Sequence, residues 1–110
     1  MLRIAKNDLR IVRGILSQQI LDCEVRAFGS RVHGRNFKTT SDLDLVIMSQ
    51  RPLSGARLAQ LKESFSESDL PIKVDVVDWA DCSSAFKNII SQQSVLIQSK
   101  APVKESRQAA

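Results

Sequence analysis

Two carboxylates stand one residue apart in an otherwise apolar stretch of the sequence. Asp42 and Asp44 alternate with leucines in the segment DLDLVIM. In a strand, residues i and i+2 project from the same face, so these side chains would lie about 7 Å apart. Two carboxylates about 4 Å apart repel by about 4 kcal/mol at an effective dielectric near 20, which a divalent cation would relieve. The pair predicts a Mg²⁺ site, because Mg²⁺ favours carboxylates and substrate phosphates; the alternative is the polar outer face of a half-buried strand.

A third carboxylate follows in the segment IKVDVVD. There, Asp75 lies between valines whose side chains point to the opposite face. If this segment forms a strand beside residues 42–48, the three acids share one face and two Mg²⁺ ions could bind. One would activate the attacking oxygen and the other would hold the phosphates and the leaving group. Solvent exposure is the alternative for Asp75, and we interpret Asp78, at the opposite parity, as a turn residue rather than a ligand.

A Gly-Ser pair precedes the acids, with eleven residues between Ser30 and Asp42. Gly29 permits a close backbone approach to a phosphate. Ser30 offers a hydroxyl and backbone N–H groups at the start of a short helix, and Arg31 adds a cation. We therefore predict that Gly29, Ser30 and Arg31 bind a nucleotide; a simple strand-to-helix turn is the alternative. His33, the only histidine, is interpreted as a surface residue.

The elements that would position these residues follow from hydrophobic spacing. Alternating patterns predict strands, and apolar residues three and four apart predict helices. The order of the elements favours an α/β (α+β) fold, in which helices flank a small mixed β-sheet. Strands are expected at residues 24–28, 42–48 and 72–78, long helices at 7–21, 55–67 and 81–97, and a short helix from Ser30 to Gly34.

The composition fits one small domain of 110 residues with a net charge of +4. We assign residues 1–98 to the domain and 99–110 to a disordered tail. No apolar run is long enough for a membrane span, and no secretory signal is visible, so we expect a cytoplasmic protein with two free cysteines. The charge weakly favours an anionic partner, but aromatic residues make up only 5% of the chain. Direct nucleic-acid binding by base stacking is therefore not expected.

The stretch FGSRVHGRNFKTTSDLDLVI resembles the Gly-Ser…Asp-x-Asp signature of the DNA polymerase beta-like nucleotidyltransferase superfamily. The segment KVDVVDW is similar to the strand that carries the third carboxylate of that superfamily. The short chain and the form GSRVHG resemble the minimal nucleotidyltransferases encoded beside HEPN-domain partners. The likeness covers roughly residues 9–97.

This resemblance implies a nucleotidyltransferase fold that uses ATP as substrate with Mg²⁺. It implies that Asp42 and Asp44 bind metal, that Asp75 is the third carboxylate, and that Gly29 and Ser30 contact phosphate. It further implies an antitoxin that transfers AMP to a tyrosine of a HEPN ribonuclease toxin, within a hetero-oligomer. His33 is a departure, because many relatives have a basic or arginine residue at its position.

Two other functions stay open. The protein could neutralise a partner by docking alone, without catalysis, or it could transfer a nucleotide to a small hydroxylated molecule such as an aminoglycoside. The short chain leaves little room for an acceptor-binding domain, which favours an acceptor carried by a partner protein. The chain contains no tyrosine, so it cannot modify a tyrosine of its own.

Overall fold

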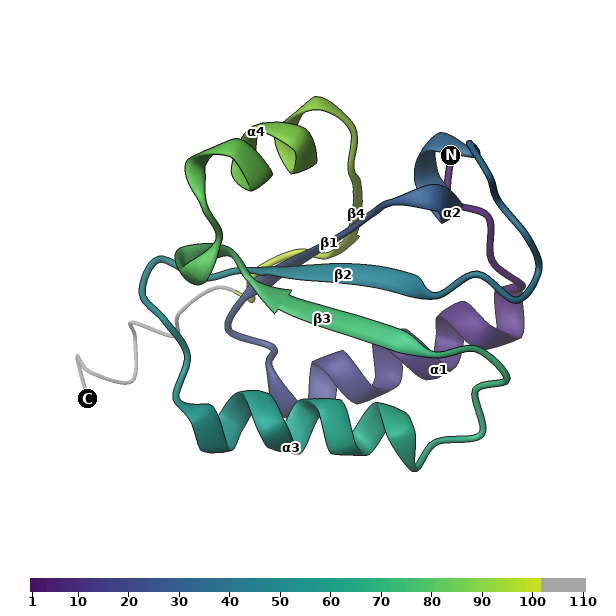
Figure 1. Ribbon diagram of the computed structural model, residues 1–110. Helices are drawn as coiled ribbons and strands as arrows, with labels where there is room; N and C mark the ends of the chain where they lie inside the picture. The colour runs from purple at the N-terminus through teal and green to yellow at the C-terminus, as the bar shows by residue number, and fades with distance from the viewer. Residues whose placement is uncertain (102–110) are drawn as a thin grey trace.

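The computed structural model describes residues 1–101. These residues form five helices and four strands, which alternate except that two helices follow one another between the third and fourth strands (Figure 1). The helices are α1 (Lys6–Gln19), α2 (Ser30–His33), α3 (Gly55–Ser66), the 3-10 helix η1 (Trp79–Asp81) and α4 (Ser84–Gln92). The strands are β1 (Glu24–Phe28), β2 (Leu43–Met48), β3 (Val74–Asp78) and β4 (Val95–Gln98).

The four strands form one mixed sheet in the order β3-β2-β1-β4. Strand β1 runs antiparallel to β2 and to β4, whereas β2 and β3 are parallel. Helices α1 and α3 cover one face, and α4 lies over part of the other (Figure 1). This arrangement confirms the predicted fold class, a small mixed sheet flanked by helices.

The core lies between the sheet and the α1–α3 layer. Alternation in β2 turns Leu43, Leu45 and Ile47 toward this layer, and all three are completely buried. They pack with the apolar stripe of α1, of which Val12 and Leu16 are also fully buried. The same alternation turns the side chain of Asp44 to the opposite face, where no long helix covers it.

The prediction of a single helix over residues 81–97 is wrong. The chain forms η1 and then α4, which begins after Ser83, whose hydroxyl accepts a hydrogen bond from the Phe86 N–H at 3.1 Å. It then extends into β4 at the edge of the sheet beside β1. Burial of Ile97, which is only 5% exposed, stabilises this strand.

The domain boundary at residue 98 coincides with the end of β4 but otherwise stays a prediction. Most of the predicted tail, residues 102–110, lies outside the described part of the chain. Within residues 1–101, none of the helices has the length and apolar character that crossing a membrane requires. Cys23 and Cys82 are both free thiols, as predicted.

Candidate active site

Two of the predicted carboxylates lie side by side on neighbouring strands. The parallel register of β2 and β3 pairs Asp44 directly with Asp75. Both residues alternate with side chains of the α1–α3 face and therefore project from the other face of the sheet. Asp42 lies just before β2, two residues from Asp44. The sheet thus places Asp44 beside Asp75, and Asp42 is near enough for its charge to act on Asp44.

The electrostatics of Asp44 reflect this arrangement. The pKa of its carboxyl is raised from 3.8 to about 6. Burial is the largest cause, and the negative charges of Asp75 and Asp42 add to it. A carboxylate that is half-buried beside two others is costly to ionise, and a bound cation would lower that cost.

The Gly-Ser turn lies against the same carboxylate. Antiparallel pairing places Phe28, the last residue of β1, opposite Asp44. The next residue, Gly29, has φ +82°, and a Cβ there would overlap the Asp44 carboxylate and lie 3.1 Å from its carboxyl carbon. Only glycine allows this approach. Ser30 follows as the first residue of α2 and is half-buried.

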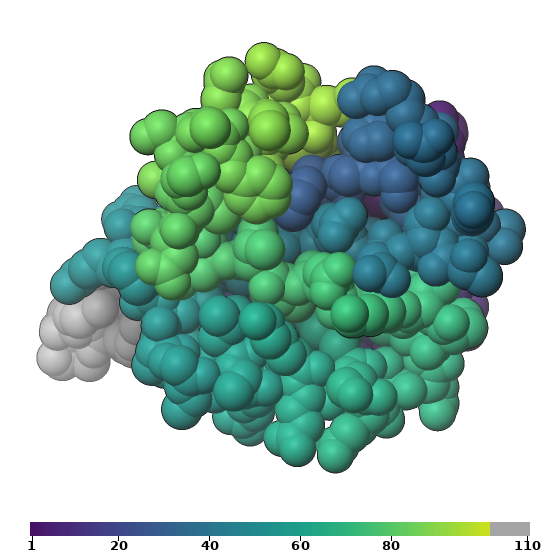
Figure 2. Space-filling view, viewed as in Figure 1, coloured from purple at the N-terminus to yellow at the C-terminus, as the bar shows by residue number. Residues whose placement is uncertain are grey.

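Two clefts meet at this point. One, of about 750 Å³, runs along the edge strand β3 and is lined by residues including Asp44, Asp75, Lys62 and Lys73. The other, of about 500 Å³, lies between α2 and α4 and is lined by residues including Gly29, His33 and Arg35. The surface is hollowed between these two helices in Figure 2.

An aromatic pair borders both clefts. The rings of Phe28 and Phe86 meet edge to face with their centroids 5.6 Å apart. Neither ring was singled out in the sequence, because nothing local in the sequence relates the end of β1 to α4. Lys62 and Lys73 were missed for the same reason: their positions depend on how α3 and β3 pack beside the acids.

The structure does not bring Arg31 into this group. Its side chain is only 4% exposed, and the hydrogen bonds of its guanidinium group go to backbone carbonyls. The predicted contact with nucleotide is therefore at odds with this geometry. His33 lines the cleft between α2 and α4, where its Nδ1 accepts a hydrogen bond from the Arg35 N–H at 2.9 Å.

Asp78 stands apart from the other acids, as the sequence predicted. It is 4% exposed and accepts a 2.7 Å hydrogen bond from the Leu53 N–H and another from the Ser49 hydroxyl. These bonds tie the end of β3 to the loop after β2. Asp78 therefore stabilises the sheet on the side away from the open acids.

The donor set fits Mg²⁺ through oxygen ligands of two strands. Within residues 1–101, however, no three ligand-type side chains are close enough together to hold an ion by themselves. Asp75 is 45% exposed and its Oδ1 lies 3.7 Å from Lys73 Nζ. Two carboxylates together with substrate phosphates would complete a Mg²⁺ site better than three carboxylates alone.

Comparison with known proteins agrees with this geometry. Residues 9–105 match the family described as "Nucleotidyltransferase domain". The chain is 50% identical over 99 residues to a "Probable protein adenylyltransferase MntA" of Haemophilus influenzae, covering 90% of this chain and 86% of that protein.

Solved structures with the same fold are more distant in sequence. A toxin–antitoxin complex with AMP-PNP contains a chain that aligns with a TM-score of 0.67 at 18% identity, over 92% of this chain and 78% of that one. The toxin–antitoxin MntA-HepT aligns with a TM-score of 0.63 at 16% identity, over 96% of this chain and 79% of that one. At such identities the likeness shows the fold alone.

Proposed function

The chain belongs to the nucleotidyltransferase domain family, and on that premise we propose that it transfers AMP from ATP to a tyrosine hydroxyl of a partner protein. The partner we propose is a HEPN-domain ribonuclease toxin, for which this protein would be the antitoxin. The relative from Haemophilus influenzae carries the name of a protein adenylyltransferase, and two structural neighbours are toxin–antitoxin complexes.

One observation carries the proposal. The Gly29 turn lies against the carboxylate of Asp44, and Asp44 is paired with Asp75 on the next strand. A turn without a side chain, next to two carboxylates and at the meeting of two clefts, suits a nucleotide whose phosphates are bound together with a cation. The relative that is 50% identical to this chain aligns with 90% of it.

Mg²⁺ belongs to the proposal, with Asp42 and Asp44 as its first ligands. When bound, it would neutralise charge on the phosphates and on the departing pyrophosphate. Gly29 and Ser30 would hold the triphosphate through backbone N–H groups and the serine hydroxyl. The proposed second ion would use Asp44 and Asp75.

Asp75 would orient the acceptor hydroxyl and accept its proton. The tyrosine oxygen would form a bond to the α-phosphorus while the bond from that phosphorus to the bridging oxygen of the β-phosphate breaks, releasing pyrophosphate. Because the protein makes no covalent intermediate in this scheme, its contribution is positioning and charge stabilisation.

The acceptor must come from another chain, because this one has no tyrosine. We propose that it is delivered within a hetero-oligomer. A cytoplasmic location is part of the same proposal, and the two free thiols are consistent with it.

The test uses ATP labelled at the α-phosphate, Mg²⁺ and the proposed HEPN-domain partner. We expect label on a tyrosine of the partner and loss of the partner's ribonuclease activity. Asp42→Asn should abolish the labelling. Glu63→Gln is the matched control, because it makes the same carboxylate-to-amide change on the exposed surface of α3. Absence of labelled partner with the unaltered protein would contradict the proposal.

Neutralisation by docking alone is a second candidate. It is favoured by the surroundings of Asp75, because its carboxylate is half-exposed and already forms an ion pair with Lys73, which would compete with a bound metal ion. The double variant Asp42→Asn, Asp44→Asn separates the two candidates. If it still silences the ribonuclease fully at equal concentration, docking is sufficient; if silencing is lost while the complex still forms, transfer is required.

A further inference from the structure

We propose that Arg31 is a positioning residue that fixes the segment leading into Asp42 and does not contact the nucleotide. This inference rests on the proposed function, because it concerns the site that would perform the transfer. It assigns to Arg31 a role different from the phosphate contact that the sequence predicted.

The guanidinium group of Arg31 is engaged on three sides. Its Nε donates to the carbonyl of Ser41 at 2.9 Å, its Nη2 to the carbonyl of Thr39 at 2.9 Å, and its Nη1 to the carbonyl of Arg3 at 2.7 Å. Its carbon atom Cζ lies 5.3 Å from the centre of the Phe37 ring. The side chain is 4% exposed, so little of it can face a ligand in either cleft.

Two of these carbonyls belong to the loop that leads from α2 to Asp42 and β2. Ser41 immediately precedes Asp42, and Thr39 lies two residues before Ser41. The residue after Asp42, Leu43, donates a 2.9 Å hydrogen bond from its N–H to the Lys73 carbonyl. The start of β2 is thus fixed from both sides. Arg31 itself follows Ser30, so one side chain joins the Gly-Ser turn to the chain that carries Asp42.

The third carbonyl extends this link to the N-terminal segment. The N–H of Arg3 donates to the Arg31 carbonyl at 2.8 Å, so these two residues bind each other's backbone. The Arg3 side chain donates to the Val32 carbonyl at 2.8 Å, and a Cβ on Gly34 would lie 2.6 Å from its guanidinium group. The first residues of the chain therefore hold α2 in place from its outer side.

Only arginine can serve here. Its planar fork offers donors in three directions at once, whereas a lysine has one ammonium group on a flexible stem and cannot reach carbonyls on three segments. Arg31→Lys keeps the charge but would release the loop from 35 to 42. A direct phosphate contact would behave differently, because lysine also binds phosphate well as a point charge.

The experiment compares Arg31→Lys with Arg10→Lys, a matched change at an exposed arginine of α1. With label transfer to the HEPN-domain partner as the assay, we expect Arg31→Lys to lower kcat at least about 10-fold and to leave KM for MgATP within about 2-fold. Backbone amide resonances of residues 39–44 should shift in the ¹H–¹⁵N spectrum. Arg10→Lys should change none of these quantities.

A rise in KM for MgATP as large as the loss of kcat would overturn the proposal, because it would place the effect of Arg31 on nucleotide binding and not on the position of Asp42. Unchanged kcat and unchanged amide resonances would also overturn it. Should Arg31→Lys fail to fold, Phe37→Leu removes only the ring beside the guanidinium group, and we expect a smaller change with the same division between kcat and KM. If the unaltered protein transfers no label at all, the proposed function fails. The positioning role can still be tested without transfer, by adding Mn²⁺ and measuring how much it broadens the amide resonances of Asp42 and Asp44. We expect weaker broadening in Arg31→Lys than in the unaltered protein.

Discussion

The two faces of the central sheet use the same strand in opposite ways. Toward α1 and α3, strand β2 presents Leu43, Leu45 and Ile47, all fully buried in a close-packed core. Toward the other face it presents Asp44, which is half-buried, has a pKa raised to about 6 and lies against a glycine. The apolar face thus supplies the stability that allows unfavourable charge to accumulate on the open face.

The largest expected effect concerns activity on the open face. Asp44→Asn should lower the transfer rate at least about 1,000-fold, which corresponds to about 4 kcal/mol in the activation barrier. The free energy of unfolding at pH 7.5 should not fall, because the variant removes a repelled carboxylate. Label transfer and urea denaturation measure the two quantities. A variant that lost stability along with activity would show that Asp44 is part of the packing.

The next effect is the converse, on the covered face. Leu45→Ala should lower the free energy of unfolding by about 3 kcal/mol, because it leaves a cavity between the sheet and the helices. The transfer rate per folded molecule should stay within about 3-fold at low temperature. Urea denaturation and label transfer at 10 °C provide the comparison. If Leu45→Ala lost activity while fully folded, the two faces would not be separable.

Gly29→Ala should affect both properties. The positive φ disfavours alanine, and its Cβ would collide with the Asp44 carboxylate. We expect a loss of about 2 kcal/mol in the free energy of unfolding and a transfer rate lowered at least 10-fold. Gly55→Ala is the matched control, because no atom lies within 4 Å of a Cβ placed there. Equal behaviour of the two variants would contradict the close approach of the Gly29 turn.

The pH dependence of stability gives a smaller effect. The folded protein holds the Asp44 proton up to about pH 6, whereas the unfolded chain releases it near 3.8. Between these values the folded state binds more protons, so its stability falls as the pH rises from about 4 to about 6. Allowing for solvent screening of a half-buried group, we expect about 1 kcal/mol in the metal-free protein.

The control for this pH dependence is Asp44→Asn, in which the contribution of Asp44 to the fall in the free energy of unfolding between pH 4 and 6 should be absent. Urea denaturation at several pH values between 4 and 7 in EDTA measures the free energy of unfolding of both proteins. Identical slopes in the two proteins would mean that Asp44 ionises normally.

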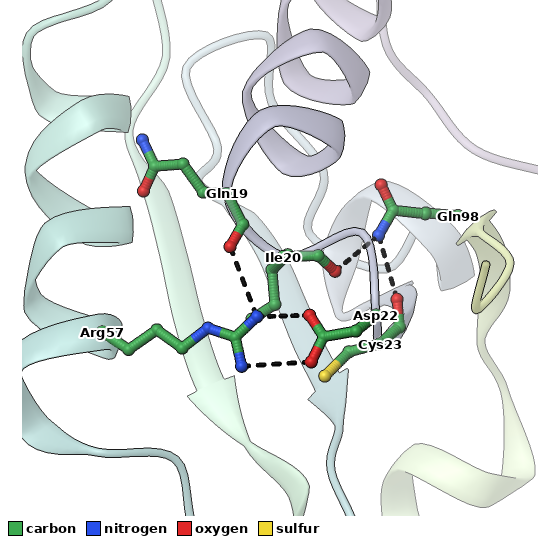
Figure 3. Close-up of polar contacts among 6 residues, drawn as sticks. All are labelled: Gln19, Ile20, Asp22, Cys23, Arg57 and Gln98. Carbon is green, nitrogen blue, oxygen red and sulfur yellow. Dashed lines mark hydrogen bonds and ion pairs between the residues drawn. The ribbon is translucent and has the colours of Figure 1, made fainter. Parts of the chain in front are cut away.

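The smallest effect is expected far from the site, where Arg57 of α3 forms an ion pair with Asp22 in the turn between α1 and β1 (Figure 3). The pair lowers the pKa of Asp22, so its stabilising effect is present above the ordinary pKa and is lost on acidification. The Asp22 side chain is 61% exposed, so Asp22→Asn should cost less than about 1 kcal/mol and leave transfer unchanged. A larger loss, measured by urea denaturation at pH 7, would show that this turn supports the sheet more than its exposure suggests.

Much of the acidic side of the molecule was predictable from local pattern. Alternation in residues 42–48 and 72–78 decides which side chains share a face, and the parallel register of the two strands did place Asp44 beside Asp75. The Gly-Ser turn was equally predictable, because a glycine between a strand and a helix indicates a special backbone conformation. The roles of these residues toward metal and nucleotide stay predictions.

The parts that could not be predicted depend on distant segments. Strand β4 has four residues, and it is a strand because β1 offers it an edge and because the core accepts Ile97. Its sequence also fits the continuation of a helix. Arg31 looks like a phosphate ligand beside Gly-Ser, yet the carbonyls that hold it come from residues 3, 39 and 41. The local sequence predicts neither the pairing of β4 with β1 nor the hydrogen bonds of Arg31.

The most direct measurement is the anomalous diffraction of Mn²⁺ in crystals grown with a non-hydrolysable ATP analogue. We expect a Mn²⁺ peak about 2.2 Å from carboxylate oxygens of Asp42 and Asp44, with the analogue's phosphates against Gly29 and Ser30. A peak at any other place, or phosphates bound away from the glycine turn, would contradict the assignment of the open acidic face as the centre of AMP transfer.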